Sequence, residues 1–156
     1  MAYPKFKTIL LEKDKEEPKI TYLTLNRPEK NNCISIGEDE MTGEIKKAMW
    51  EVNHDDDCSV VIFRGAGKNY CAGFDLSMVY RVYGGAKGFK PSQRIRLQTD
   101  QDQLYGFPQA ILDCNKVVMV QVHGWAIEAG LYITKAADIV ICADTAKFSQ
   151  MGQRLA

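Results

Sequence analysis

A strand that is buried on both faces is encoded by Ser59-Val60-Val61-Ile62-Phe63-Arg64. Such a continuous β-branched run is typical of a strand inside a parallel sheet that helices cover on both sides. Before it, residues 36–54 have helix-forming composition, and apolar side chains recur near helical spacing at Met41, Ile45, Ala48, Met49 and Val52. After it, residues 116–122 form a second run of the buried-strand type. This alternation of strand and helix predicts an α/β layered fold.

Further elements are expected on both sides of this centre. Two paired strands are predicted at residues 7–12 and 20–25, around an exposed charged loop. A helical turn and then a mobile loop are predicted over residues 75–91, where no clear hydrophobic period exists. A helix is expected over residues 96–112, with a kink or break at Gly106 and Pro108. The last two expected elements are a helix over residues 129–137 and a strand over residues 139–143.

The bulk composition indicates one globular domain over residues 1–156, with enough apolar residues (46%) to bury a core. Twenty basic side chains balance twenty acidic ones, and no arginine-rich stripe occurs, which argues against a nucleic-acid partner. No apolar run approaches the length of a membrane span, and the first residues do not form a signal peptide. A soluble, cytoplasmic protein with no membrane partner is therefore expected.

The five cysteines are far apart, form no C-x-x-C pair and are accompanied by only two histidines. This spacing argues against disulfides and against a metal site, so no metal is predicted. Free cysteine packs as a small apolar residue, and each of the five is expected to be buried in that role. They are Cys33, Cys58, Cys71, Cys114 and Cys142.

Common nucleotide and hydrolase motifs are missing from the sequence. Residues 65–68 read Gly-Ala-Gly-Lys, but Asn69 follows the lysine and the spacing of a P-loop is not met. The sequence also has no G-x-G-x-x-G at a strand–helix junction, no H-E-x-x-H and no G-x-S-x-G. Classes of enzyme that depend on these motifs are excluded.

Two segments rich in small residues follow predicted strands and lead toward helices. They are residues 68–76, Lys-Asn-Tyr-Cys-Ala-Gly-Phe-Asp-Leu, and residues 123–131, His-Gly-Trp-Ala-Ile-Glu-Ala-Gly-Leu. Small residues let a ligand oxygen approach the main chain, and a helix start supplies unpaired N–H groups, so two such turns could converge on one carbonyl oxygen. The alternative is that these glycines only permit tight turns.

Four ordered motifs resemble the crotonase superfamily of enoyl-CoA hydratase/isomerase-like enzymes. They are Leu25-Asn26-Arg27-Pro28-Glu29-Lys30-x-Asn32, Cys71-Ala72-Gly73-x-Asp75-Leu76, Gly124-x-Ala126-x-x-x-Gly130, and the run from Ala137 to Phe148. The resemblance covers almost the whole chain and implies a crotonase (ClpP/crotonase-like) spiral of repeated ββα units. The family domain continues past residue 156, so a form truncated at its carboxyl end is expected. By the same analogy the assembly is expected to be a homotrimer or a hexamer.

The resemblance also implies how the site works. A thioester carbonyl of an acyl-CoA is held by two backbone N–H groups, which by position are those of Phe74 and Ala129, as an enolate-like oxyanion develops. The phenyl ring of Phe74 must then turn away from the acyl chain or reshape its pocket, the alternative role of the ring being ordinary packing. Coenzyme A is part of the substrate, so no separate cofactor is expected. Its binding site is assigned to Asn26, Lys30, Asn32, Cys33, Ala72, Phe74, Asp75, Leu76 and Ser77.

The two glutamates of the family's hydratases are replaced here, at matching positions, by Tyr132 and Gly152. Neither can serve as a general base at neutral pH, because tyrosine is protonated and glycine has no side chain. Tyr132 is a tentative catalytic residue that could donate a hydrogen bond or orient a carboxylate; the alternative is core packing. Glu128, one helical turn before it, is a displaced acid/base candidate; the alternative is an acid favoured by the helix dipole.

Two residues beside the turns receive non-catalytic interpretations. His123 is interpreted as a hydrogen-bonded structural imidazole at the end of a strand. Asp75 is expected to order the first turn through local hydrogen bonds.

The leading hypothesis is an acyl-CoA enzyme of the hydratase/isomerase type, a lyase or isomerase, with a non-standard proton-transfer group. A decarboxylase or a thioester or ring hydrolase on the same fold is the alternative, because family branches run such reactions with the same oxyanion hole. A different class also stays open: a catalytically weak CoA-binding or assembly subunit.

Overall fold

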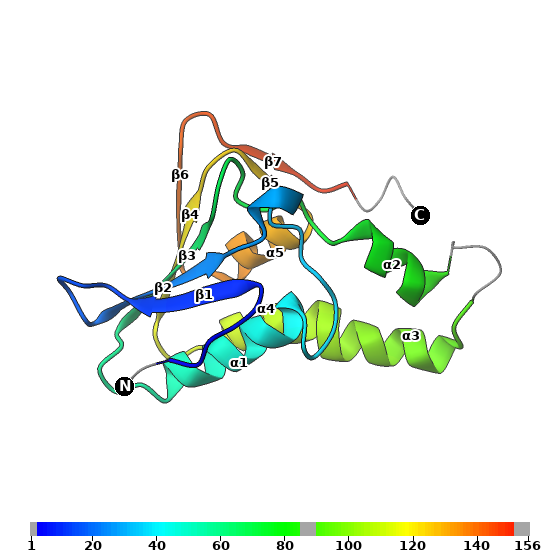
Figure 1. Ribbon diagram of the computed structural model, residues 1–156, viewed down its shortest axis with the longest axis horizontal. Helices are drawn as coiled ribbons and strands as arrows, with labels where there is room; N and C mark the ends of the chain where they lie inside the picture. Colours follow the sequence, from blue (N-terminus) through cyan, green and yellow to red (C-terminus); the bar gives the residue numbers. More distant parts are fainter. Residues whose placement is uncertain (1–2, 85–89, 152–156) are drawn as a thin grey trace.

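The predicted central strand lies in the middle of a five-stranded sheet with the order β1-β2-β3-β4-β6 (Figure 1). The strands β1 and β2 are antiparallel, and every later neighbour is parallel. The parallel pairing and the helices beside the sheet confirm the α/β prediction. The prediction that the central strand is buried on both faces is wrong, because Val61 and Phe63 are buried while Val60 and Ile62, on the other face, are only half-buried. The bounds of the strands are β1 Ile9–Lys13, β2 Ile20–Leu25, β3 Val60–Gly65, β4 Val117–Val122 and β6 Ile139–Cys142.

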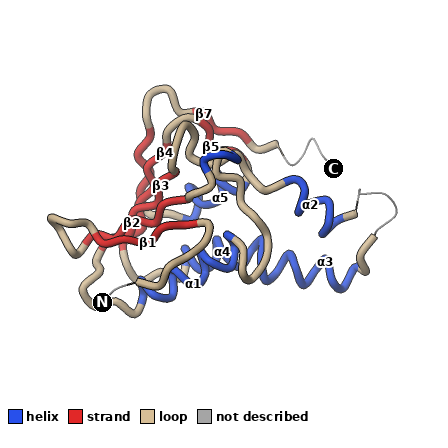
Figure 2. The backbone as a smooth tube through the Cα atoms, in the orientation of Figure 1, coloured by secondary structure: helices blue, strands red, loops and turns tan. Residues whose placement is uncertain are grey.

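The computed structural model describes residues 3–84 and 90–151. Within these, a second sheet joins β5 (Trp125–Ile127) to β7 (Lys147–Ser149) in parallel, beyond the ends of the main strands (Figure 2). Neither strand is among the elements predicted from the sequence. Three residues are too few to display a period of two, so only the pairing partner reveals them.

The helix α1 (Met41–Asn53) lies along one side of the sheet (Figure 1). All five apolar positions of the predicted amphipathic pattern are buried, which confirms that pattern. The predicted start at residue 36 is wrong, however, because Ile34 forms an isolated parallel bridge with Phe74 and Gly37 then has a positive φ of 152°. These residues hold the chain in a non-helical path until Glu40, the N-cap.

A long helical path follows from α3 (Gln93–Thr99) through a π-helical stretch, η2 (Asp100–Tyr105), into α4 (Gly106–Leu112). A break at Gly106 and Pro108 does not occur, since α4 includes both residues. The kink predicted as the alternative stays a prediction. Pro108 has no N–H to donate, so one backbone hydrogen bond of the helical path is missing there. The hydrogen-bond pattern changes just upstream instead, from the wider π-helix to the α-helix.

Two shorter helices flank the candidate site. The expected helical turn after Asp75 is α2 (Leu76–Tyr83), while the mobile loop predicted next includes residues 85–89, which lie outside the described residues. A single 3₁₀ turn, η1 (Pro28–Lys30), follows β2. The helix α5 (Ala129–Ala136) ends one residue before its predicted end and lies behind the sheet, facing α4 (Figure 1).

The cysteines correct one prediction. Cys58 and Cys71 are buried, but Cys33 and Cys114 are half-buried and Cys142 is exposed, so burial holds for two of the five. Cys142 is exposed because it lies in β6, the last strand of the main sheet, whose four residues are all exposed. Among residues 3–84 and 90–151, no group of three His, Cys, Asp or Glu side chains is placed to hold a metal ion. No described helix is both long and apolar enough to cross a bilayer.

Candidate active site

The first turn follows β3 and is shaped by Gly73. In an extended strand, N–H groups two residues apart point to the same side. The Ala72 N–H donates to the carbonyl of Asn31, in the loop after β2. If the chain stayed extended, the Phe74 N–H would point toward that loop as well. Gly73 instead has a φ of 96°, a conformation open mainly to glycine. Ile34 donates its N–H to the Gly73 carbonyl and accepts from the Asp75 N–H. The Phe74 N–H, which lies between these two contacts, therefore faces away from Ile34.

The second turn joins β4 to β5 and then to α5. At its start, Gly124 has a φ of 58°, and a Cβ there would lie 2.5 Å from Asn69 Oδ1 and 2.6 Å from the Lys68 carbonyl oxygen. Asn69 Oδ1 also accepts a hydrogen bond from the Trp125 N–H, 3.1 Å away. The lack of a side chain at Gly124 thus lets the backbones of the two turns approach each other.

Backbone and side-chain contacts bring the two turns together along their length. Cys71 pairs with Ala126 in a parallel bridge. A Cβ on Gly130 would lie 2.7 Å from Cys71 Cβ, and a Cβ on Gly73 would lie 3.3 Å from Glu128 Cβ. Phe74 and Ala129 directly follow Gly73 and Glu128, the two residues of this last contact.

The Ala129 N–H has no acceptor within α5 because of its place in that helix. Ala129 is the first residue of that helix, and the first N–H groups of a helix have no intrahelical acceptor. The residue is fully buried. The N–H groups of Phe74 and Ala129 are thus candidate donors to a ligand oxygen.

Glu128 connects the second turn to α5 through an unusual backbone. Its φ is 45° and its ψ is −102°, a conformation that costs a non-glycine residue energy and that is found at functional sites. The Tyr132 hydroxyl donates to Glu128 Oε1, and the Met151 N–H donates to Oε2 at 2.8 Å. The carboxylate is thereby held from two sides, and its side chain does not cap α5.

Tyr132 is a hydrogen-bond donor in this pair. Burial, followed by the hydrogen bond to Glu128 and the charge of that carboxylate, raises the pKa of Tyr132 to about 12. The phenol stays protonated at neutral pH, which agrees with the sequence argument that it cannot be a general base. Its hydroxyl orients a carboxylate, one of the two roles considered for it.

The Phe74 ring turns toward the helices. Its centroid lies 6.2 Å from that of Phe107 in α4, at an interplanar angle of 79°, and 6.1 Å from that of Tyr132, at 59°. These are favourable edge and tilted geometries for aromatic pairs. The ring is partly buried against the core and held in one position.

The chain matches a known family of proteins over most of its length. The family model described as enoyl-CoA hydratase/isomerase matches residues 15–155. The chain belongs to the enoyl-CoA hydratase/isomerase family.

Named relatives agree with this assignment. Over 147 residues the chain is 32% identical to a probable enoyl-CoA hydratase of Mycobacterium tuberculosis, covering 94% of this chain and 51% of that one. Over 154 residues it is 29% identical to a peroxisomal Δ(3,5)-Δ(2,4)-dienoyl-CoA isomerase of Arabidopsis thaliana, covering 96% and 53%. The chain spans about half the length of the curated relatives it matches.

A solved structure supports the fold. The crystal structure of an enoyl-CoA hydratase from Shewanella pealeana superposes with a TM-score of 0.82 at 20% sequence identity, covering 97% of this chain and 52% of that one. At this identity the likeness concerns the fold alone. It confirms the expected crotonase fold.

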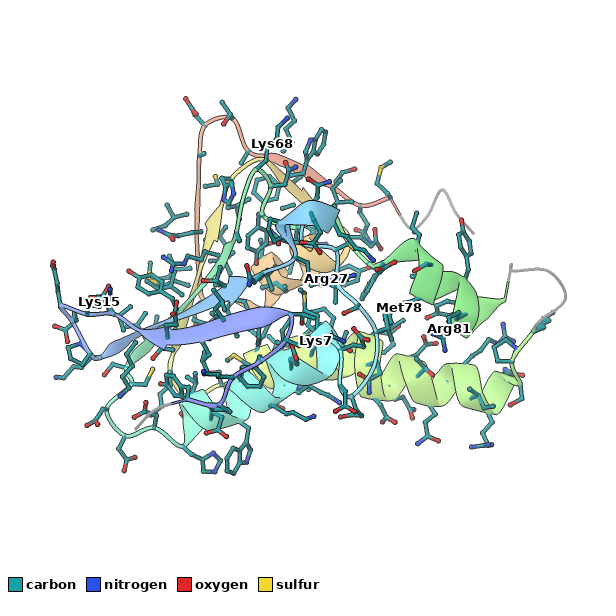
Figure 3. The ribbon with its side chains drawn as sticks, viewed as in Figure 1. Lys7, Lys15, Arg27, Lys68, Met78 and Arg81 are labelled. Carbon is teal, nitrogen blue, oxygen red and sulfur yellow. The ribbon has the colours of Figure 1, made fainter. Side chains whose placement is uncertain are left out.

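In this member of the enoyl-CoA hydratase/isomerase family, the loop after β2 is tied to the first turn by Asp75. Its carboxylate caps α2 through the Ser77 N–H and lies 3.1 Å from the Arg27 guanidinium and 3.6 Å from Lys30 Nζ. Figure 3 shows Arg27 on this loop, beside the start of α2. These contacts agree with the expectation that Asp75 orders the turn by local hydrogen bonds. The ion pair with Arg27 was not predicted from the sequence, although Arg27 belongs to the first of the four family motifs.

Lowering the pH is expected to weaken this tie. Burial alone raises the pKa of Asp75, but hydrogen bonds from Ser77 and Arg27 and the charges of Lys30 and Arg27 outweigh it and lower the pKa to about 2. In the unfolded chain it is about 3.9, so the ionised carboxylate stabilises the fold above that pH by an amount on the order of 2 kcal/mol. This contribution is lost as the pH falls toward 2.

Denaturant unfolding of the protein and of Asp75→Asn at pH 6 and pH 3 measures this effect. The free energy of unfolding of the variant should lie below that of the unaltered protein at pH 6, and the gap should narrow at pH 3. Other carboxyl groups titrate in both proteins and cancel in the difference. An equal gap at both pH values would contradict the assignment.

The other residues assigned to coenzyme A divide into three groups. Asn32 is fully buried, and its amide is used by the backbone: Oδ1 accepts from Arg27 N, and Nδ2 donates to the carbonyls of Ala66 and Asn69. Asn32 therefore shapes the loop from inside. Surface positions that remain open to a ligand belong to Lys30, Leu76 and Ser77.

Three further positions of the assigned set contribute through their backbone or by packing. Asn26 donates its N–H to Thr8, and Ala72 donates to Asn31. Cys33 is half-buried, its carbonyl accepts from Arg27 at 2.8 Å, and burial together with the nearby Asp75 raises the pKa of its thiol. Their side chains are thus less direct candidates for ligand contact than Lys30.

Two remaining sequence expectations concern the edges of the site. His123 Nε2 lies 2.9 Å from the Gly67 carbonyl oxygen, which agrees with the interpretation of a structural imidazole. Gly152, which matches the second hydratase glutamate, lies outside the described residues.

The role of Asn69 was not predicted from the sequence. Its side chain donates to Asn31 and accepts from the Trp125 N–H, so it joins the loop after β2 and the first turn to the second turn. Its place directly before Tyr70-Cys71 was the only signal in the sequence.

Proposed function

We propose that the protein is an acyl-CoA enzyme of the hydratase/isomerase type that stabilises a thioester enolate between the N–H groups of Phe74 and Ala129. The observation that carries this proposal is the contact of the two turns, in which Gly73 meets Glu128 and Gly130 meets Cys71. Removing one donor from an oxyanion hole typically costs roughly 100- to 1000-fold in turnover. Two fixed donors therefore supply a large part of the catalysis that the reaction needs.

Proton transfer is assigned to Glu128. The carboxylate removes a proton from the carbon next to the thioester carbonyl, or from the carbon conjugated with it. The electron pair moves to the carbonyl oxygen, and Glu128 becomes a neutral acid that returns the proton at another carbon. Tyr132 acts as a positioning residue, because its hydroxyl bonds to one carboxylate oxygen. The same two oxygens accept and return the proton, so no net proton is gained or lost.

The charge of Glu128 is compatible with an adjacent oxyanion hole. A permanent negative charge there would oppose the developing oxyanion. Glu128 becomes neutral in the same step in which the enolate becomes charged, so the site holds one negative charge before and after proton transfer. Fixed N–H dipoles then favour the charge on the ligand oxygen over the charge on the carboxylate.

Coenzyme A is assigned to the side of the turn that faces the loop after β2. The ammonium group of Lys30 is more than half exposed there, next to Asp75. A cation at this place suits the phosphate groups of coenzyme A. The trimeric or hexameric assembly expected from the family resemblance stays a prediction.

The test is incubation of the whole protein with a set of acyl-CoA esters in D2O, with products analysed by mass spectrometry. We expect deuterium to enter butyryl-CoA next to the carbonyl, and enoyl esters to be converted. Isomerisation leaves the mass of an unlabelled product unchanged, hydration adds one water, and decarboxylation or thioester hydrolysis releases carbon dioxide or free coenzyme A. Binding without exchange or turnover would reduce the protein to a CoA-binding subunit, and absence of binding would overturn the proposal.

A further inference from the structure

The turn that carries the Phe74 N–H has two different sides. On one side, Asn31, Arg27 and Lys30 contact Ala72 and Asp75. The Phe74 side chain instead contacts two rings from the helices α4 and α5, those of Phe107 and Tyr132, and we call these three rings the aromatic wall. A thioester held at the hole with its coenzyme A toward the charged loop must extend its acyl group toward the aromatic wall.

The aromatic wall is fixed in place. Phe107 is fully buried in α4, and its ring meets that of Phe74 nearly edge to face. Tyr132, in α5, is held by its hydrogen bond to Glu128, and its ring centroid lies 6.1 Å from that of Phe74. A ring that contacts aromatic neighbours on two helices cannot swing aside without losing both contacts. Phe74 therefore occupies space next to its own N–H, where the acyl chain would run.

We infer that the aromatic wall closes the acyl end of the site and that the protein selects short acyl-CoA esters over long straight-chain ones, with Phe74 as the residue that determines specificity. This inference rests on the proposed function for the position of the thioester. The N–H of Phe74 holds the carbonyl whatever the side chain is, while the ring limits the chain beyond it. Backbone and side chain of one residue thus have separate roles.

The experiment measures binding of two saturated esters, butyryl-CoA and decanoyl-CoA, by calorimetry. The unaltered protein should bind butyryl-CoA at least as tightly as decanoyl-CoA. In Phe74→Ala the ratio of the two affinities should shift toward decanoyl-CoA by at least tenfold, because the missing ring leaves room for added methylene groups. The variant Phe74→Leu should give a smaller shift and serves if the alanine variant does not fold.

Phe6→Ala is the matched control, since Phe6 is also a partly buried phenyl against the core but belongs to the segment before β1. It should leave the ratio unchanged. A tenfold preference of the unaltered protein for decanoyl-CoA, or an unchanged ratio in Phe74→Ala and Phe74→Leu, would overturn the inference. Binding of butyryl-CoA without proton exchange would defeat the proposed catalysis and leave the length selection standing. No binding of either ester would overturn both.

Discussion

Replacing Gly73 by alanine is expected to lower turnover by roughly 100- to 1000-fold, the cost of losing one oxyanion donor. Gly73 has a φ of 96°, and this conformation turns the Phe74 N–H away from Ile34. An added Cβ makes that conformation strained and lies 3.3 Å from Glu128 Cβ. The chain relieves the strain by returning toward an extended path, and the Phe74 N–H then points to the wrong side. Steady-state kinetics on the best substrate of the screen measures the loss.

A strained substitution also costs stability, on the order of 1–3 kcal/mol, so the loss of turnover needs a control that separates the two effects. Gly37→Ala provides it. Gly37 also has a positive φ, of 152°, and its added Cβ meets only the Glu40 side chain, at 3.3 Å. It lies before α1, outside both turns. The control should lose stability and keep most of its turnover. Equal losses of turnover in the two variants would mean that Gly73 acts only through stability.

Much of the fold can be predicted from the sequence because its strongest signals are local. The β-branched run predicts β3 itself, and the apolar spacing of α1 predicts burial that the structure shows at all five positions. In β3 only alternate residues are buried, so the run predicts the strand but not its burial on both faces. The signals fail where a distant partner decides the conformation. β5 and β7 become strands only by pairing with each other, and the start of α1 is delayed by the bridge between Ile34 and Phe74.

The candidate site divides in the same way. Small residues at Gly73, Gly124 and Gly130 indicate two turns, but only the fold shows that each glycine is a place where one turn touches the other. Glu128 reads in the sequence as an ordinary acid at a helix start. Its left-handed φ and its hydrogen bond to Tyr132 depend on how β5 leads into α5, which no local pattern of residue types encodes.

The second large effect is expected at that residue. Glu128→Gln keeps the size of the side chain and can still bond to Tyr132, but an amide cannot accept and return a proton. Loss of a general acid–base group typically costs roughly 100- to 10,000-fold, so turnover and deuterium exchange should both fall by about that factor. Binding of butyryl-CoA should change little, because the two N–H donors remain. The substitution removes only a negative charge, which does not attract the carbonyl oxygen.

Tyr132→Phe distinguishes a catalytic Glu128 from one that only shapes the turn. It removes the hydroxyl that holds Oε1 while the Met151 N–H still holds Oε2, so the carboxylate stays in the site with less restricted orientation. Turnover should fall by a smaller factor than in Glu128→Gln, and the double variant should be no worse than Glu128→Gln alone, because a positioning residue has no effect once its carboxylate is gone. Additive losses would show that Tyr132 acts on the substrate directly. Unchanged exchange in Glu128→Gln would move the proton-transfer group to another residue and leave the backbone donors of Phe74 and Ala129 as the catalytic part of these two turns.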